Sequence, residues 1–297
     1  MFTGLSAFPL TPMNERAIDE AAFARLVERL AAAGVASIGA LGSTGSYAYL
    51  TRAERARVAR LAVAHAGEVP VIVGIGALRT REVLALAEDA EAAGASGVLL
   101  APMSYQPLTD EEVFGLFEAV CRQVSLPLCV YDNPGTTHFT FSDELHGHIA
   151  ALPNVASIKI PGVPADPAAA RERVERLRAR VPSEVTIGVS GDAFAATGLN
   201  AGCDAWYSVI GGLFPETALT ITRAARAGDA EKARALAAAL EPLWALFRRH
   251  GGSLRVVASA AELLGLAESP CLPLPLRTLQ GQERRQLAEV LEALALH

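Results

Sequence analysis

Short, continuously apolar runs recur along this chain, and each is followed by a longer segment with helical periodicity. Strands that are buried on both faces of a parallel sheet have this continuous character, whereas half-exposed strands alternate apolar with polar residues. The eight runs cover residues 5–10, 35–42, 69–76, 97–102, 126–132, 155–160, 185–190 and 204–210. Eight βα units within about 225 residues favour a closed (β/α)8 barrel, the TIM barrel of the α/β class.

Local signals support the helices between these runs. Three threonines precede amphipathic segments, and the first and last of them have a glutamate three positions later, the capping-box arrangement: Thr51, Thr80 and Thr109. Glycines stand where three helices should end: Gly34, Gly67 and Gly94. A doubly wound open sheet is the rival fold, but Gly74-Ile75-Gly76 lacks the third glycine of a dinucleotide fingerprint, because Arg79 occupies that position.

The strand pattern stops near residue 228. We therefore expect a catalytic barrel over residues 1–227, with its last helix near 216–227, and a C-terminal helical domain over residues 228–297. Helical patterns cover 229–250, 253–267 and 281–296, and residues 271–276 form a proline-rich connector. We expect this appendage to pack on the barrel.

Charge and composition exclude several classes of function. A net charge of −6 attracts neither nucleic acid nor an anionic membrane surface. The first residues lack a basic stretch followed by an apolar one, and no apolar run approaches about 18 residues, so neither a signal peptide nor a membrane span is expected. The expected location is the cytoplasm. The four cysteines form no C-x-x-C pair, and we expect Cys129, inside an apolar run, to be a reduced core thiol.

Lysine is scarce in this chain. Of 26 basic residues only two are lysines, Lys159 and Lys232. Lys232 lies in an amphipathic helical segment and is interpreted as a surface charge. Lys159 lies between two isoleucines in an apolar run, an unfavourable place for a charge. Because a partly buried lysine can lose its proton and an arginine cannot, Lys159 is a candidate nucleophile; a buried ion pair or a side chain that extends to solvent is the alternative.

Barrel enzymes place their chemistry at the carboxyl ends of the strands. In this chain those positions supply the Lys159 amine, several hydroxyls, a phenol, and glycine-containing loops whose backbone N–H groups can hold a small carboxylate. No cluster of His, Cys and carboxylate residues occurs there, and His146 and His148 are only two apart on an expected helix, so they face different sides. We expect neither a metal nor another cofactor, and amine chemistry is favoured over metal-dependent enolate chemistry.

Four short motifs follow one another in a fixed order: Gly42-Ser43-Thr44-Gly45, Tyr131-Asp132-Asn133-Pro134, Ser157-Ile158-Lys159 and Ser190-Gly191-Asp192. The tyrosine and the lysine are separated by 28 positions. On eight βα units, this set resembles the dihydrodipicolinate synthase / N-acetylneuraminate lyase family over nearly the whole chain.

The resemblance implies roles for these residues. Lys159 would condense with the keto carbon of pyruvate or another 2-keto acid to form an imine. Tyr131 would carry protons to and from the imine carbon and the substrate hydroxyl. Ser43 and Thr44 would hold the carboxylate of the 2-keto acid. One of them would also link Tyr131 into a hydroxyl relay, and Thr44 is our candidate for this catalytic role. The remaining substrate-binding candidates are Gly42, Gly45, Thr136, Gly191 and Tyr207.

The resemblance also implies a homotetramer, built as a dimer of dimers, in which a second tyrosine reaches into the site of a neighbouring subunit. Tyr105 is our candidate for this catalytic position. Counting back from Tyr131 selects Tyr105, whereas matching from Pro102 selects Ser104, and both alternatives stay open.

Three positions depart from the family pattern. Thr136 stands where the synthases of the lysine pathway carry an arginine that grips a second carboxylate, and a hydroxyl cannot replace a bidentate guanidinium. Ser46 replaces a glutamate, and Tyr207 replaces a small aliphatic residue.

The leading interpretation is a Schiff-base lyase that performs retro-aldol cleavage or dehydration of a 2-keto-3-deoxy sugar acid. The alternatives are dihydrodipicolinate synthase itself and a non-catalytic barrel that binds a small keto acid. The paired Lys159 and Tyr131 favour catalysis over binding alone.

Overall fold

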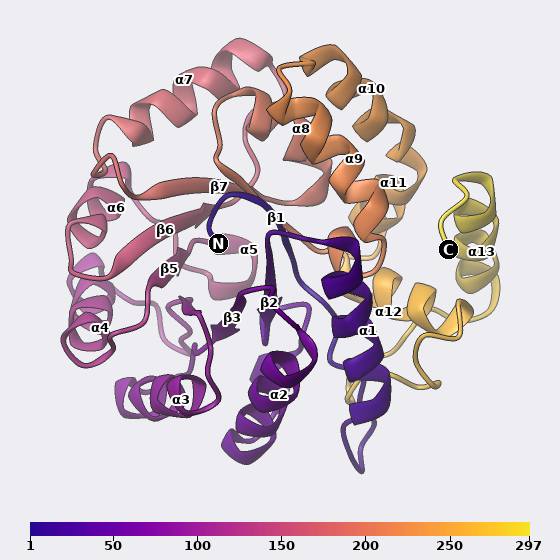
Figure 1. Cartoon of the computed structure of the whole chain (residues 1–297), viewed down its shortest axis with the longest axis horizontal. Coiled ribbons are helices and arrows are strands. Elements are labelled where there is room, and N and C mark those ends of the chain that lie inside the picture. The colour runs from indigo at the N-terminus through magenta and orange to yellow at the C-terminus, as the bar shows by residue number, and fades with distance from the viewer.

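The computed structural model describes residues 1–297 and contains a closed barrel of parallel strands ringed by helices (Figure 1). The strands follow one another around the barrel in sequence order, and β8 closes the sheet by pairing in parallel with β1. The strands are β1 (Gly4–Ala7), β2 (Ser37–Ala40), β3 (Val71–Gly74), β4 (Gly97–Leu100), β5 (Leu128–Tyr131), β6 (Val155–Ile160), β7 (Thr186–Ser190) and β8 (Ala205–Ser208). Each overlaps the apolar run that predicted it, and the (β/α)8 fold is confirmed.

Nine α-helices accompany the strands. They are α1 (Glu20–Ala33), α2 (Arg52–His65), α3 (Thr80–Ala92), α4 (Asp110–Gln123), α5 (Pro134–Thr137), α6 (Asp143–Ala150), α7 (Pro167–Arg178), α8 (Ala195–Asn200) and α9 (Pro215–Arg226). Both predicted capping boxes are present, at Thr51 and Thr109. The third expected cap, Thr80, is wrong: the carbonyl of Arg79 already accepts the first helical N–H groups, so Arg79 is the N-cap of α3 and Thr80 is its first residue.

The C-terminal part is helical, as expected, with α10 (Ala230–Ala239), α11 (Glu241–Arg249), α12 (Leu254–Leu263) and α13 (Gly281–Ala293). The single helix expected over residues 229–250 is wrong, because the chain breaks at Leu240 between α10 and α11. Pro242 explains the break, since proline has no N–H to donate into a helix and disfavours helical geometry in the residue before it. Figure 1 shows α10 beside α8 and α9, with α13 at the rim.

Two apolar clusters hold the molecule together. The larger lies between strands and helices and continues into the C-terminal helices through Ala233, Leu243, Val256 and Leu287, so the appendage shares its core with the barrel. The smaller lies inside the barrel and includes the candidate-site residue Tyr131, together with Phe2, Phe8, Ile72, Leu99, Ala101, Cys129, Ala205 and Tyr207. All four cysteines are free and buried. None of the helices has both the length and the apolarity needed to cross a bilayer.

Candidate active site

Lys159 points into the barrel from the carboxyl end of β6. Strands β5 and β6 pair so that Tyr131 and Lys159 are direct neighbours in the ladder, and the N–H of Asp132 donates to the Lys159 carbonyl at 3.0 Å. The side chain is buried, and its Nζ lies 4.0 Å from the ring centroids of both Phe8 and Tyr131 and 5.6 Å from that of Tyr207. No carboxylate pairs with it, so the alternative of a buried ion pair is excluded.

The aromatic cage formed by Phe8, Tyr131 and Tyr207 has a chemical consequence. Ring faces attract a cation, and this attraction is larger away from water. A protonated imine on Lys159 would meet these three ring faces. The cage therefore accommodates positive charge at this nitrogen without a counter-ion that would compete with a substrate carboxylate.

The Tyr131 phenol has two polar neighbours. Its Oη lies 3.3 Å from Oγ of Ser43, and Nδ2 of Asn133 donates to it at 2.7 Å. Thr44 is also buried but makes no hydrogen bond to Tyr131. Of the two hydroxyls that the sequence offered for a relay, the structure brings that of Ser43 to the phenol.

The loop after β2 that carries Ser43 and Thr44 has a constrained backbone and packs closely against β3. Leu41 and Ser46 both adopt left-handed backbone angles, with φ of 58° and 53°, which non-glycine residues rarely do. On β3, a Cβ added to Gly74 would lie 1.9 Å from the carbonyl oxygen of Leu41. The loop can take this path only because residue 74 has no side chain, so β3 fixes the position of the candidate carboxylate-binding loop on β2.

Tyr207 lies inside the barrel beneath the amine. Its Oη lies 2.6 Å from Ser157 Oγ and accepts a contact from Cys129 Sγ at 3.5 Å, while Ser157 is also bonded to Thr186. Burial raises the pKa of Tyr207 well above its usual range. A Cβ on Gly188 would lie 2.3 Å from the ring, so the bulky β8 residue fits because β7 has a glycine where the ring packs. Tyr207 therefore borders Lys159 with its ring, while its hydroxyl is bonded within the barrel.

The ends of β7 and β8 are joined by Asp192, a residue of the fourth quoted motif to which the sequence assigned no role. Its buried carboxylate accepts hydrogen bonds from Trp206 Nε1, Ser208 Oγ and the backbone N–H groups of Val209 and Ile210, at 2.8–3.1 Å. Burial raises the pKa of Asp192, and these four donors oppose that rise. The predicted binding residue Gly191 precedes it with φ of 81°. Asp192 thus fixes the loops that flank Gly191.

Two predicted residues lie at the barrel mouth rather than at the amine. Tyr105 is 90% exposed, the most exposed large hydrophobic residue of this chain. Thr136 is exposed on α5, and its hydroxyl donates to the carbonyl of Asn133 at 3.4 Å. Ser46, the other departure, is buried, and its Oγ has no hydrogen-bond partner.

A buried acid and a buried imidazole lie behind the segment that carries Tyr131. Nε2 of His146 lies 3.4 Å from Oδ2 of Asp132, and the His146 ring stacks on Phe141. Burial raises the pKa of Asp132 to about 7, against the opposing charge of Arg173, and burial lowers the pKa of His146 to about 4. Burial therefore favours the neutral form of each group over an ion pair.

Sequence reasoning missed Phe8 and Asn133 as neighbours of the reacting groups. Both lie where barrel enzymes place their chemistry, just beyond the carboxyl end of a strand. Phe8 comes directly after β1, and Asn133 comes two residues after β5. That rule alone could have selected them.

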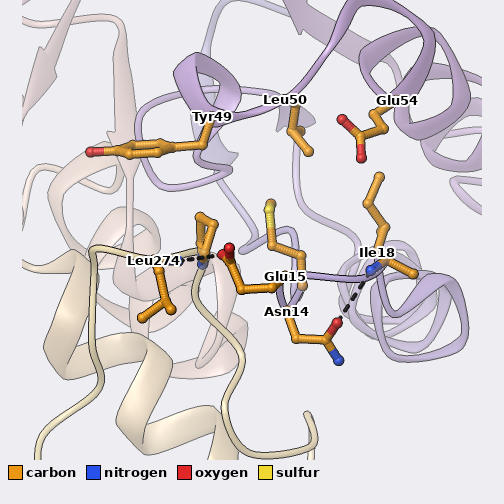
Figure 2. Close-up of a pocket in the computed structure, with 10 residues that line it drawn as sticks. Asn14, Glu15, Ile18, Tyr49, Leu50, Glu54 and Leu274 are labelled. Atoms are coloured by element: carbon orange, nitrogen blue, oxygen red, sulfur yellow. Dashed lines mark hydrogen bonds between the residues drawn. The ribbon is translucent and has the colours of Figure 1, made fainter.

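A separate cavity of about 260 Å³ lies between the loop after β1, the start of α2 and the proline-rich connector (Figure 2). Lys159 does not line it. Its two carboxylates are both engaged, because Glu15 accepts the N–H of Leu274 at 2.8 Å and Glu54 completes the Thr51 capping box. Figure 2 shows the Glu15 side chain directed at the Leu274 backbone. The cavity is part of the junction between barrel and connector.

Comparisons with known proteins extend over the whole chain. The model of the dihydrodipicolinate synthetase family matches residues 1–294. The 4-hydroxy-tetrahydrodipicolinate synthase of Hyphomonas neptunium is 36% identical over 242 residues, 80% of each chain. The enzyme of that name from Persephonella marina is 30% identical over 296 residues, 98% of each chain.

Solved structures agree in fold. A dihydrodipicolinate synthase from Agrobacterium tumefaciens superposes with a TM-score of 0.94 at 50% identity, covering 99% of this chain and 98% of that one. A putative dihydrodipicolinate synthetase from Pseudomonas aeruginosa gives a TM-score of 0.89 at 31% identity, covering 99% and 100%. A monomeric dihydrodipicolinate synthase variant gives a TM-score of 0.89 at 27% identity, covering 100% and 98%.

Proposed function

This chain belongs to the dihydrodipicolinate synthetase family and is a class I aldolase-type lyase, and on that premise we propose that it forms a Schiff base with pyruvate or a related 2-keto acid through Lys159. The proposed reaction is retro-aldol cleavage, or dehydration, of a substrate of the 2-keto-3-deoxy sugar acid type. The observation that carries the proposal is a buried amine with no ion-pair partner, caged by three aromatic rings beside Tyr131. A dihydrodipicolinate synthase from Acinetobacter baumannii, 26% identical, has been crystallised with pyruvate.

The chemistry follows from the positions of these groups. Nζ of Lys159 adds to the keto carbon, water leaves, and the protonated imine becomes an electron sink. Tyr131 gives its proton to the water that leaves. In cleavage, the C3–C4 bond then breaks, its electron pair moves into the enamine, C4 leaves as an aldehyde, and the C4 hydroxyl proton returns to the Tyr131 oxygen, directly or through Ser43. Protonation of C3 and hydrolysis of the imine then release the 2-keto acid. Ser43 and Thr44, with the N–H groups of Gly42 and Gly45, hold the carboxylate.

A second candidate is 4-hydroxy-tetrahydrodipicolinate synthase, which is favoured by the names of the curated relatives. That reaction joins pyruvate to an aldehyde that carries a second carboxylate. Thr136 argues against it, because its exposed hydroxyl is bonded to the backbone and offers no bidentate cation. One assay distinguishes the two candidate functions. Turnover of 2-keto-3-deoxy sugar acids would support the lyase, and condensation of pyruvate with a carboxylate-bearing aldehyde would support the synthase.

Borohydride reduction in the presence of pyruvate, followed by intact mass and peptide mapping, tests the central step. We expect one adduct, located on Lys159. Lys159→Ala abolishes it, and Lys159→Arg does so while keeping a cation over the rings, because a guanidinium does not form the imine. The matched control Lys232→Arg, at a surface position on α10, leaves the adduct intact.

An adduct that persists in Lys159→Ala would contradict the assignment. If no adduct forms with pyruvate or with a panel of larger 2-keto acids, the remaining option is a barrel that binds a keto acid without catalysis.

We further propose that the chain acts in the cytoplasm as a homotetramer, a dimer of dimers. The exposed Tyr105 supports this assembly, because a phenol at the barrel mouth is free to reach the site of a neighbouring subunit. Sedimentation velocity gives the size of the assembly. In mixtures of subunits, an inactive Lys159→Ala subunit that restores activity to a Tyr105→Phe subunit would establish the exchange.

A further inference from the structure

Asn133 stands at the N-cap of α5 but does not act as a cap. An asparagine at this position ordinarily accepts a backbone N–H with its side-chain oxygen. Here the side chain makes no capping bond, and only the backbone carbonyl of Asn133 accepts the N–H groups of Thr136 and Thr137, as the carbonyl of any N-cap residue does. The side chain is turned to Tyr131, and its Nδ2 donates to the phenol oxygen at 2.7 Å.

The direction of this hydrogen bond limits what Tyr131 can do with its own proton. A phenol has one donor and two acceptor positions, and an amide nitrogen can only donate. Asn133 therefore uses an acceptor position of Tyr131 and leaves the phenol proton for Ser43, 3.3 Å away, or for a ligand on Lys159. When Tyr131 releases that proton, the Asn133 bond becomes charge-assisted and gains strength.

We propose that Asn133 is a positioning residue for Tyr131: its amide orients the phenol and stabilises the oxyanion that forms when Tyr131 passes on its proton. This inference rests on the proposed function of Lys159 and Tyr131. It adds a third group to the proton relay, from a position at which the family motifs assigned no role.

The test needs no knowledge of the second substrate. Pyruvate is the probe, and the readout is deuterium exchange of its methyl protons in D₂O, followed by proton NMR, which reports imine and enamine formation. Asn133→Asp keeps the size of the residue but replaces the amide donor with an acceptor. We expect its maximal exchange rate to fall roughly 10- to 100-fold, with an unchanged KM for pyruvate and no loss of thermal stability.

Three further variants separate positioning from a structural effect. Asn133→Leu removes the amide without adding charge and gives a loss of similar size. Asn14→Asp makes the same chemical change on the loop after β1, where the side-chain oxygen that accepts from Arg16 and Ala17 is kept, and leaves exchange unchanged. In a Tyr131→Phe background, the change Asn133→Asp alters the residual rate less than about twofold, because the two residues act as one unit.

Each outcome decides the matter. If Asn133→Asp exchanges pyruvate like the wild type, the amide is not a required donor and the proposal is overturned. The same holds if Asn133→Asp causes its full loss again in the Tyr131→Phe background. Borohydride trapping distinguishes failure of the larger proposal: both Asn133 variants should still form the Lys159 adduct, whereas a wild-type protein with neither adduct nor exchange overturns the proposed function itself.

Discussion

Gly188 and Tyr207 fill one layer of the barrel together, and this fit can be tested by Gly188→Ala. The new Cβ would lie 2.3 Å from Cε2 and 2.8 Å from Cδ2 of Tyr207. Non-bonded carbons prefer about 3.5–4.0 Å, so the ring has to retreat by roughly 1 Å or more. Its hydroxyl is bonded to Ser157 at 2.6 Å, so the ring cannot retreat without straining or breaking that bond.

Two contributions set the expected size of the effect. Overpacking a core by one methyl group costs about 1–3 kcal/mol, and a weakened buried hydrogen bond adds about 0.5–1.5 kcal/mol. We therefore expect Gly188→Ala to lower the free energy of unfolding by about 2–4 kcal/mol, with a fall of roughly 3–6 °C in Tm. Because the Tyr207 ring lies beneath Lys159, adduct formation with pyruvate should also slow.

The assay is urea and thermal unfolding followed by circular dichroism, with borohydride trapping on the same samples. Gly115→Ala is the matched control: Gly115 lies within α4 with open space around it, so this change should stabilise by up to about 1 kcal/mol. Tyr207→Val alone leaves a cavity, and Gly188→Ala added to it should be neutral or stabilising. A wild-type Tm for Gly188→Ala, or simple additivity of the two changes, would refute the argument.

Three further predictions concern the site and its support. Tyr131→Phe should slow turnover far more than it weakens carboxylate binding, and an equal loss in kcat and in the Kd of a 2-keto acid would contradict a proton-carrying role. Thr136→Arg should lower the KM for a carboxylate-bearing aldehyde about tenfold or more without changing the Lys159 adduct; an unchanged KM would mean that the second carboxylate is bound elsewhere. As the pH is lowered from 6.5 to 4, the stability of Asp132→Asn should fall by about 1.4 kcal/mol per unit more than that of the wild type, because His146, with its pKa lowered to about 4, then takes up a proton only on unfolding. In the wild type Asp132, with its pKa raised to about 7, is protonated only in the folded state over this range and offsets that loss; equal slopes in urea unfolding for the two proteins would disprove the balance.

The sequence predicted the barrel and the position of its reactive amine for simple reasons. Strands buried on both faces have to be apolar throughout, so their number can be counted from the chain. Lys159 was identifiable because a chain that prefers arginine keeps a lysine inside one of those runs.

The relay itself could not be derived from periodicity. Ser43 and Thr44 are adjacent on a loop whose neighbours Leu41 and Ser46 adopt left-handed angles, and no helical or strand repeat says which hydroxyl faces Tyr131. Asn133 has the residue type and place of a helix cap, and only the fold shows that it contacts Tyr131 instead.

The direction of the Tyr207 hydroxyl could not be predicted from the sequence either. It depends on Gly188 and Ser157, on two other strands, and such a long-range fit leaves no trace in the residues around Tyr207.

The contact between Leu41 and Gly74 bears on how this protein can diverge. A descendant selected for another substrate can explore larger or charged side chains at Thr136, which is exposed at the barrel mouth. Residue 74 has no such freedom, although it touches no substrate, because the carbonyl of Leu41 occupies the volume that a methyl group would need. A mutational library for altered selectivity should therefore hold position 74 constant and treat it as part of the neighbouring loop.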